Sequence, residues 1–199
     1  MRDYYEELWR ELPDELEPPD VELRRAWLTH DLRPDLRVLD LGCGEGHFTA
    51  EIAAAGASVV GAEVAQAAID RARARHPELE FARVEIDGPL PFADGAFDLV
   101  WASEVIEHVS DTARWLSEAR RVLKSGGVLL ITTPSHGRLR LAVGGLERFS
   151  EPLGDHLHLY TRRSLTETLT AFGFGELTVR AVGGPPLLRR LLLARGVRE

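Results

Sequence analysis

The chain of 199 residues contains little cysteine and no long apolar run. Cys43 is its only cysteine, so no internal disulfide can form, and a secreted fold held together by disulfides is excluded. No stretch approaches the ~20 consecutive apolar residues that a membrane-spanning helix needs. The N-terminus carries charges where a signal peptide has an apolar core. We therefore expect an unprocessed cytoplasmic protein without a membrane span.

Positive charge is scarce as well. The chain has 24 Lys and Arg against 32 Asp and Glu, a net charge of −8 at pH 7, which argues against DNA, RNA or an anionic membrane as partner. The composition, with 44% hydrophobic and 28% charged residues, is that of a globular protein. At ~150 residues per domain we expect one domain over residues 1–199. Ten acidic residues against four Arg in residues 1–31 predict a solvated face or an acidic lid near a site for a cationic or polar substrate.

From residue 37 onward, short apolar runs alternate with segments of helical period. The pattern predicts strands at 37–41, 58–63, 79–86, 97–103, 128–133, 177–182 and 191–197, and helices at 48–55, 67–75, 111–124 and 165–172. Strands joined by helices pair in parallel, and apolar runs without alternation are typical of a sheet covered on both faces. The expected fold class is α/β, a doubly wound and mostly parallel sheet with helices on both faces.

Two local details of the last third can be read in more than one way. Ser164 and Glu167 have the spacing of a capping box for the last helix. Residues 186–195 fit either a strand of an antiparallel closing pair or a short amphipathic helix.

The domain divides into four segments by their expected roles. Residues 1–30 read as a helical cover, 31–134 as the core that holds a ligand, 135–160 as a loop on the substrate side and 161–199 as the closing helix and strands. Aromatic residues of the first segment predict either a lid or ordinary core packing: Tyr4, Tyr5, Trp9 and Trp27. Three arginines of the loop predict either an anion site or isolated surface charges: Arg138, Arg140 and Arg148.

A glycine loop follows the first strand. Gly42 and Gly44 let the backbone approach a ligand closely, while His47 stands where a dinucleotide loop has its third glycine. Glu45 adds a negative charge that disfavours a pyrophosphate at this helix N-terminus. The loop therefore predicts a ligand that resembles a nucleoside without phosphates.

Two acids complete this site. Asp40 ends the first strand and can accept a hydrogen bond from an ammonium group or orient the loop, and Glu63 ends the second strand, where a carboxylate suits a ribose diol. An adenosine with an amino-acid tail satisfies all of these features. That description fits S-adenosylmethionine.

These segments resemble the class I S-adenosylmethionine-dependent methyltransferases of the small-molecule type. The resemblance is carried by the run 38–46, by Glu63, and by Leu90-Pro91-Phe92 ahead of the strand 97–103. It implies a seven-stranded sheet of order 3-2-1-4-5-7-6 with the last strand antiparallel. It also implies a set of cofactor-binding residues: Asp40, Gly42 and Gly44 for the methionine part, Glu63 for the ribose, Ile86 and Asp87 for the adenine, and, without an assigned part, Cys43, Val64 and Ser103. In the family the adenine acid usually lies one residue earlier than Asp87, where this chain has Ile86.

Two carboxylates and an imidazole follow the fourth strand, at the edge where such sheets bind ligands. Methyl transfer needs a positioned nucleophile and often a base. His108 is the first candidate for that base because an imidazole accepts a proton near neutral pH, and Glu104 and Glu107 are the other candidate catalytic residues.

This segment is similar to ubiquinone-pathway O-methyltransferases and to small-RNA 2′-O-methyltransferases. The second resemblance implies a quartet for Mg²⁺, Mn²⁺ or Zn²⁺ made by Glu104, Glu107, His108 and His156, and such an ion would acidify a substrate hydroxyl. Related small-molecule enzymes share the Glu-His pattern without a metal, so a structural or orienting role for His108 stays open.

The sequence thus predicts a methyltransferase that moves a methyl group from S-adenosylmethionine to a small molecule, leaving S-adenosylhomocysteine. Oxygen is favoured over nitrogen or carbon as the acceptor atom by analogy alone. The alternatives are a non-catalytic regulatory subunit that binds S-adenosylmethionine and a metal-assisted 2′-O-methyltransferase acting on RNA, while His47 argues against an NAD-dependent oxidoreductase. A monomer or a homodimer is expected.

Overall fold

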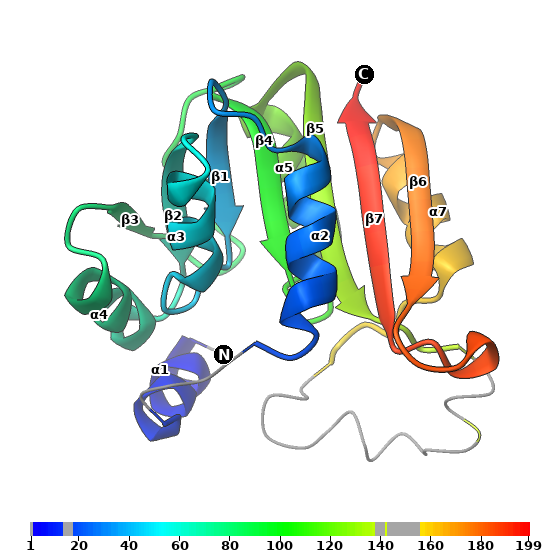
Figure 1. The fold of residues 1–199 in the computed structure, drawn as a ribbon, viewed down its shortest axis with the longest axis horizontal. Helices are drawn as coiled ribbons and strands as arrows, with labels where there is room; N and C mark the ends of the chain where they lie inside the picture. The colour runs from blue at the N-terminus through cyan, green and yellow to red at the C-terminus, as the bar shows by residue number, and fades with distance from the viewer. Residues whose placement is uncertain (1, 14–17, 138–141, 143–155) are drawn as a thin grey trace.

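The computed structural model describes residues 2–13, 18–137, 142 and 156–199 of the chain. Its centre is a seven-stranded sheet of order β3-β2-β1-β4-β5-β7-β6 (Figure 1). The strands are β1 Arg37–Leu41, β2 Ser58–Glu63, β3 Glu80–Arg83, β4 Phe97–Ser103, β5 Leu123–Pro134, β6 Phe174–Val182 and β7 Leu191–Arg198. Strands β1 to β5 pair in parallel, and β7 runs antiparallel between β5 and β6. The predicted fold class and strand order are confirmed.

Helices cover both faces of this sheet. They are α1 Arg2–Glu11, α2 Val21–Asp31, α3 His47–Ala54, α4 Gln66–Arg75, α5 Thr112–Val122 and α7 Arg162–Ala171, with a 3-10 turn η2 at Pro186–Leu188. Helices α2 and α3 pack on one face of the sheet, and α5 and α7 pack on the other. Within the described part of the chain, every helix is too short or too polar to cross a membrane.

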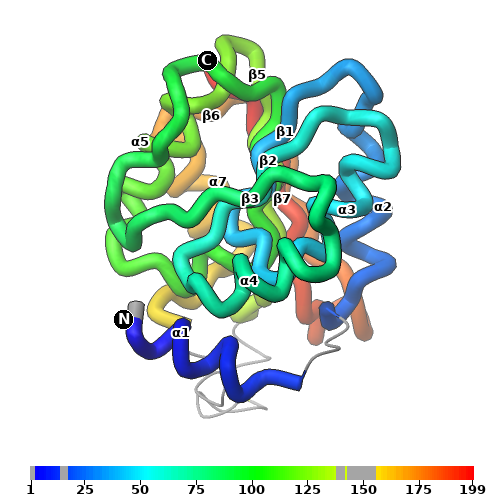
Figure 2. Tube along the Cα trace, turned by 90° about the vertical axis from the view of Figure 1, so that its left-hand side faces the viewer, coloured from blue at the N-terminus to red at the C-terminus, as the bar shows by residue number. Residues whose placement is uncertain are grey.

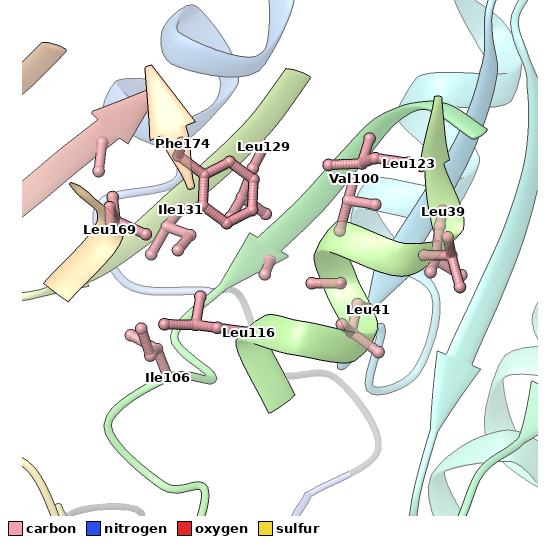
Figure 3. Packing of buried hydrophobic residues seen from close by; sticks show 14 of the residues in the cluster. Leu39, Leu41, Val100, Ile106, Leu116, Leu123, Leu129, Ile131, Leu169 and Phe174 are labelled. Atoms are coloured by element: carbon pink, nitrogen blue, oxygen red, sulfur yellow. The ribbon is translucent and has the colours of Figure 1, made fainter. Parts of the chain in front are cut away.

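Each central strand is buried on both sides, as its apolar run predicts. In β1, Val38 packs among residues of α2 and α3, whereas the next residue, Leu39, packs in the larger cluster with α5 and α7. Figure 3 shows Leu39 and Leu41 in that cluster near the α5 helix. Trp27 of α2 belongs to the opposite cluster, where its Nε1 donates to the Ala194 carbonyl at 3.3 Å. Trp27 is therefore core and not part of a lid.

The boundary between α5 and β5 differs from the prediction. The helix ends at Val122 and the strand begins at once with Leu123, whereas the prediction placed a helix at 111–124, a strand at 128–133 and a break between them. Leu123 pairs with Phe97, and regular pairing resumes only at Val128, so the intervening residues form an irregularity within the strand. Gly126, with φ +75°, makes that excursion sterically inexpensive.

The start of α7 also differs from the prediction. Thr161 is the N-cap, and its capping box pairs it with Ser164, because the helix begins at Arg162. Glu167 instead binds Arg163 one turn away, at 2.7 Å. The predicted capping box of Ser164 with Glu167 was wrong, because the observed box lies one helical turn earlier in the chain.

Two strand predictions need a smaller correction. β3 covers only Glu80–Arg83, because its partner β2 ends at Glu63, to whose carbonyl the Val84 amide still donates at 2.9 Å, and residues 84–86 then line the cavity. The ambiguous segment 186–195 divides between η2 and β7.

Candidate active site

A cavity of about 380 Å³ lies at the carboxyl ends of β1, β2 and β4. Its wall combines the glycine loop, the segment after β3, the segment after β4 and the inner side of α1. Figure 1 shows α1 below the ends of these strands. Among the predicted site residues, those in the wall are Asp40, Gly42, Cys43, Gly44, Glu63, Val64, Ile86, Asp87, Ser103, Glu104 and His108. Arg138, Arg140 and Arg148 lie outside the described residues.

The glycine loop is shaped by side chains that press on it. Gly42 has φ +82°, and a Cβ at this position would overlap Cγ2 of Val105. Gly44 has φ +53°, and a Cβ there would lie 2.9 Å from Cη2 of Trp9. The amide of Gly42 donates to the Ala62 carbonyl at 2.7 Å, which ties the loop to β2. Only glycine fits both positions, so the bare backbone forms this part of the wall.

Buried carboxyls flank the loop. Asp40 accepts a hydrogen bond from Thr49 Oγ1 at 2.6 Å, and burial raises the pKa of Asp40 to about 7. Glu63 accepts from the amides of Gly44, Val64 and Ala65 at 3.1, 2.7 and 3.2 Å. Burial raises the pKa of Glu63 while these amides lower it. A carboxylate has about four acceptor positions, so Glu63 keeps one for a ligand hydroxyl.

Two loop side chains are less available to a ligand than their positions indicated. The side chain of Cys43 packs in a small hydrophobic cluster with Ile69 and Phe81, where burial raises the pKa of its thiol. The thiol therefore belongs to the core. Glu45 forms an ion pair with Arg75 of α4. The charge that was expected to repel a pyrophosphate is therefore compensated.

The remaining residues expected to bind the cofactor, Ile86, Asp87 and Ser103, also line the cavity. Asp87 has φ +52°, and its Oδ1 accepts the Asp111 amide at 3.3 Å, so it joins the segment after β3 to the start of α5. Ser103, at the end of β4, shares a hydrogen bond of 2.8 Å with Thr132. Their contacts with a cofactor remain a prediction.

Glu104 is held by a residue that the sequence analysis missed. Its Oε2 lies 3.1 Å from Nη2 of Arg24, and its Oε1 accepts from Thr132 Oγ1 at 3.1 Å. Arg24 is 4% exposed, lines the cavity, and its Nε has no hydrogen-bond partner among the described residues. A guanidinium so deeply buried is rare without a partner or a ligand. Its position in the buried stripe of α2, between Val21 and Trp27, is the signal that could have found it.

Glu107, His108 and His156 form a cluster behind the cavity wall. Glu107 is fully buried, accepts from Thr133 Oγ1 at 2.9 Å, and lies with Oε1 3.8 Å from Nε2 of His108. Burial, followed by the charge of Glu104, holds the pKa of Glu107 well above its ordinary value. His108 lines the cavity, whereas Glu107 is not among the lining residues. The catalytic roles expected of both residues remain predictions.

A further histidine, also missed by the sequence analysis, completes this cluster. The ring centroids of His108 and His156 are 5.1 Å apart, and His156 Nδ1 lies 3.2 Å from Nε2 of the buried His136. His136 precedes the loop and is distant in sequence from both partners, so no local spacing could have pointed to it.

The predicted metal quartet is brought together only in part. One ligand atom each of Glu107, His108 and His156 lies within 4.8 Å of the others, and Glu107 Oε1 has no hydrogen-bond partner among the described residues. These three groups fit a divalent ion. Glu104 is instead directed to Arg24. A metal here remains a prediction.

Comparison with known proteins decides what kind of domain this is. A family model described as a methyltransferase domain matches residues 1–178. The chain belongs to this methyltransferase family. S-adenosylmethionine is the methyl donor of the family, and the methyltransferase domain has the α/β sheet order seen here, so an NAD-dependent oxidoreductase is excluded. The glycine cradle and the buried acids fit this donor.

The chain spans between half and two thirds of the length of three curated relatives that it matches. A probable S-adenosylmethionine-dependent methyltransferase of Mycolicibacterium smegmatis is 36% identical over 138 residues, 69% of this chain and 51% of the relative. A sarcosine/dimethylglycine N-methyltransferase of Halorhodospira halochloris is 32% identical over 78% of this chain and 57% of its own. A ubiquinone biosynthesis O-methyltransferase of Rhizobium johnstonii is 32% identical over 73% of this chain and 62% of its own.

A solved structure shows the same fold. Phosphoethanolamine N-methyltransferase 2 of Haemonchus contortus, in complex with S-adenosyl-L-methionine, superposes with a TM-score of 0.78 at 18% identity, over 99% of this chain and 56% of that one. The methyltransferase fold is thus shared, while the relatives' names include both O- and N-methylation and leave the acceptor atom undecided.

Proposed function

We propose that this methyltransferase moves the methyl group of S-adenosylmethionine to a hydroxyl of a small molecule, with His108 as general base. The observation that carries the proposal is the placement of His108, an imidazole in the cavity wall just after β4, supported from behind by Glu107. A hydroxyl must lose its proton as it attacks the methyl group, so a positioned base is of use there. An uncharged amine does not need a base before it attacks the methyl group, because its nitrogen already carries a free electron pair.

Binding of the donor is assigned residue by residue. Glu63 keeps acceptor capacity for a ribose hydroxyl, and the bare backbone of Gly42 and Gly44 leaves room for the methionine part. Arg24 presents a buried cation in the same wall, and we assign it to the carboxylate of the methionine. Asp40, which also faces the cavity, suits the ammonium group of the same tail.

The test is methyl transfer from labelled S-adenosylmethionine to three acceptors, one for each chemistry. Catechol offers a phenolic hydroxyl, dimethylglycine an amine and trans-aconitate a carboxylate. Oxygen methylation of catechol, lowered about 10²- to 10⁴-fold in His108→Ala with unchanged affinity for S-adenosylhomocysteine, is the expected result. Methylation of dimethylglycine that survives this substitution would move the assignment to nitrogen. A short RNA is assayed beside these three small molecules. Cofactor binding without transfer to any of the four would favour the regulatory subunit.

Chelation separates the two ways of activating a hydroxyl. Activity that survives EDTA assigns proton removal to His108 alone. Activity that is lost with EDTA and restored by Mn²⁺ or Zn²⁺ assigns it to an ion at Glu107, His108 and His156.

A further inference from the structure

Helix α1 is held against α4 by a carboxylate. The amides of Gln66 and Ala67, the first residues of α4, donate to the two oxygens of Glu6 at 2.7 and 3.0 Å. The Gln66 hydrogen bond is the largest of the effects that lower the pKa of Glu6. A helix N-terminus stabilises a negative charge, so Glu6 docks its helix where the charge is favourable.

This docking point adjoins the expected ribose site. The two preceding amides, those of Val64 and Ala65, donate to Glu63. Four consecutive amides, those of residues 64–67 between the end of β2 and the first turn of α4, thus bind two carboxylates, one from β2 and one from α1. A shift of α1 would disturb this segment, whose first two amides hold Glu63.

The C-terminal end of α1 is also tied to α4. Arg71 donates to the carbonyls of Leu12 and Pro13 at 2.7 and 3.2 Å. Figure 2 shows α1 lying beneath α4 along its length. The helix is therefore attached at its middle, through Glu6, and just beyond its C-terminal end.

Apolar side chains form the inner face of α1. Those that line the cavity are Tyr4, Tyr5, Leu8 and Trp9, and Leu12, just beyond the end of the helix, continues this face. The acidic residues Asp3, Glu7 and Glu11 are exposed to solvent. These three carboxylates of α1 thus face solvent, and the side of the helix that lines the cavity is aromatic and aliphatic.

We propose that α1 is a docked wall of the cofactor cavity and that Glu6 is its positioning residue. Glu6 acts through Trp9, whose ring lies over Gly44, and through the other apolar residues of the inner face. The wall excludes water from the cavity and packs against an apolar part of the bound molecule. The effect on ligand binding rests on the proposed function, whereas the docking itself does not.

Hydrogen exchange tests the docking without any ligand. In Glu6→Ala the amides of Gln66 and Ala67 lose their acceptors, and we expect them to exchange at least about tenfold faster. Glu6→Gln, which keeps one acceptor oxygen, should restore part of the protection. Glu7→Ala, on the exposed side of the same helix, is the matched control and should leave both amides unchanged. Equal exchange in Glu6→Ala and Glu7→Ala overturns the proposal.

Calorimetric titration with S-adenosylhomocysteine tests the link to the cavity. We expect about tenfold weaker binding in Glu6→Ala and in Trp9→Ala, and no further loss in the double variant, because both substitutions act through the same helix. Additive losses would mean that Trp9 does not depend on Glu6 and would overturn the positioning role. Failure of the unmodified protein to bind would instead overturn the proposed function, while the exchange result would still decide the docking.

Discussion

Replacing Gly42 by alanine should cost more than replacing another glycine of the same backbone conformation. Gly42 and Gly126 have φ of +82° and +75°, which costs an alanine roughly 1–2 kcal/mol. A Cβ on Gly126 meets nothing within 4 Å, whereas one on Gly42 overlaps Val105. Forcing Val105 to move adds about 1–3 kcal/mol. We therefore expect Gly126→Ala to lower the free energy of unfolding by about 1–2 kcal/mol and Gly42→Ala by about 2–5 kcal/mol.

Urea unfolding of the two variants measures this difference directly. Calorimetry with S-adenosylhomocysteine should show weakened binding for Gly42→Ala and unchanged binding for Gly126→Ala, since Gly126 is remote from the cavity wall. Val105→Ala combined with Gly42→Ala should recover part of the lost stability, because the smaller side chain makes room for the methyl group. Equal destabilisation by both glycine substitutions would refute the close packing of Val105 on the loop.

Two further predictions concern charged residues of the cavity. Arg24→Met should weaken the binding of S-adenosylhomocysteine about tenfold, because a charged hydrogen bond to its carboxylate is lost. Binding of methylthioadenosine, which lacks this carboxylate, should be unchanged in calorimetry. Equal losses of affinity for both ligands would contradict the assignment of Arg24. Burial raises the pKa of Asp40 from 3.8 to about 7, so folding retains a proton that unfolding releases, and stability falls as pH rises from about 4 to about 7. Asp40→Asn removes this loss of stability with pH. The free energy of unfolding of the variant, measured in urea, should therefore exceed that of the unmodified protein by an amount that grows between pH 5 and pH 8, toward about 4 kcal/mol. Parallel pH profiles would show that Asp40 does not titrate in this range.

The strands of the sheet were predictable because the evidence for each of them is local. Each central strand is an apolar run, and Val38 and Leu39 fill the two faces that the run predicts. The glycine loop and Glu63 follow strand ends in the sequence, so their meeting at one edge follows from parallel pairing. The resemblance to a known family then supplied the order of the strands.

Residues that reach the site from parts of the chain distant in sequence could not be predicted in this way. Glu6 binds amides 60 residues away, and no periodicity encodes such a contact. His136 reaches His156 only because the chain leaves β5 and returns beside it. Arg24 left a visible signal, a charged residue in an apolar helical stripe, but that signal does not name its partner. Such contacts are decided by tertiary packing.

Backbone strain marks the same edge of the sheet. Asp87 and Glu104 are among the few described non-glycine residues with positive φ, at +52° and +56°, and both line the cavity. Such a conformation costs of order 1–3 kcal/mol and persists only where the surroundings hold it. At Glu104 the backbone amide donates to the Thr132 carbonyl at 2.8 Å while Arg24 and Thr132 bind the carboxylate. Local sequence propensity does not predict these two backbone conformations, because tertiary contacts hold the backbone in a strained geometry that places side chains at the cavity. Such departures from local preference are expected at a ligand site.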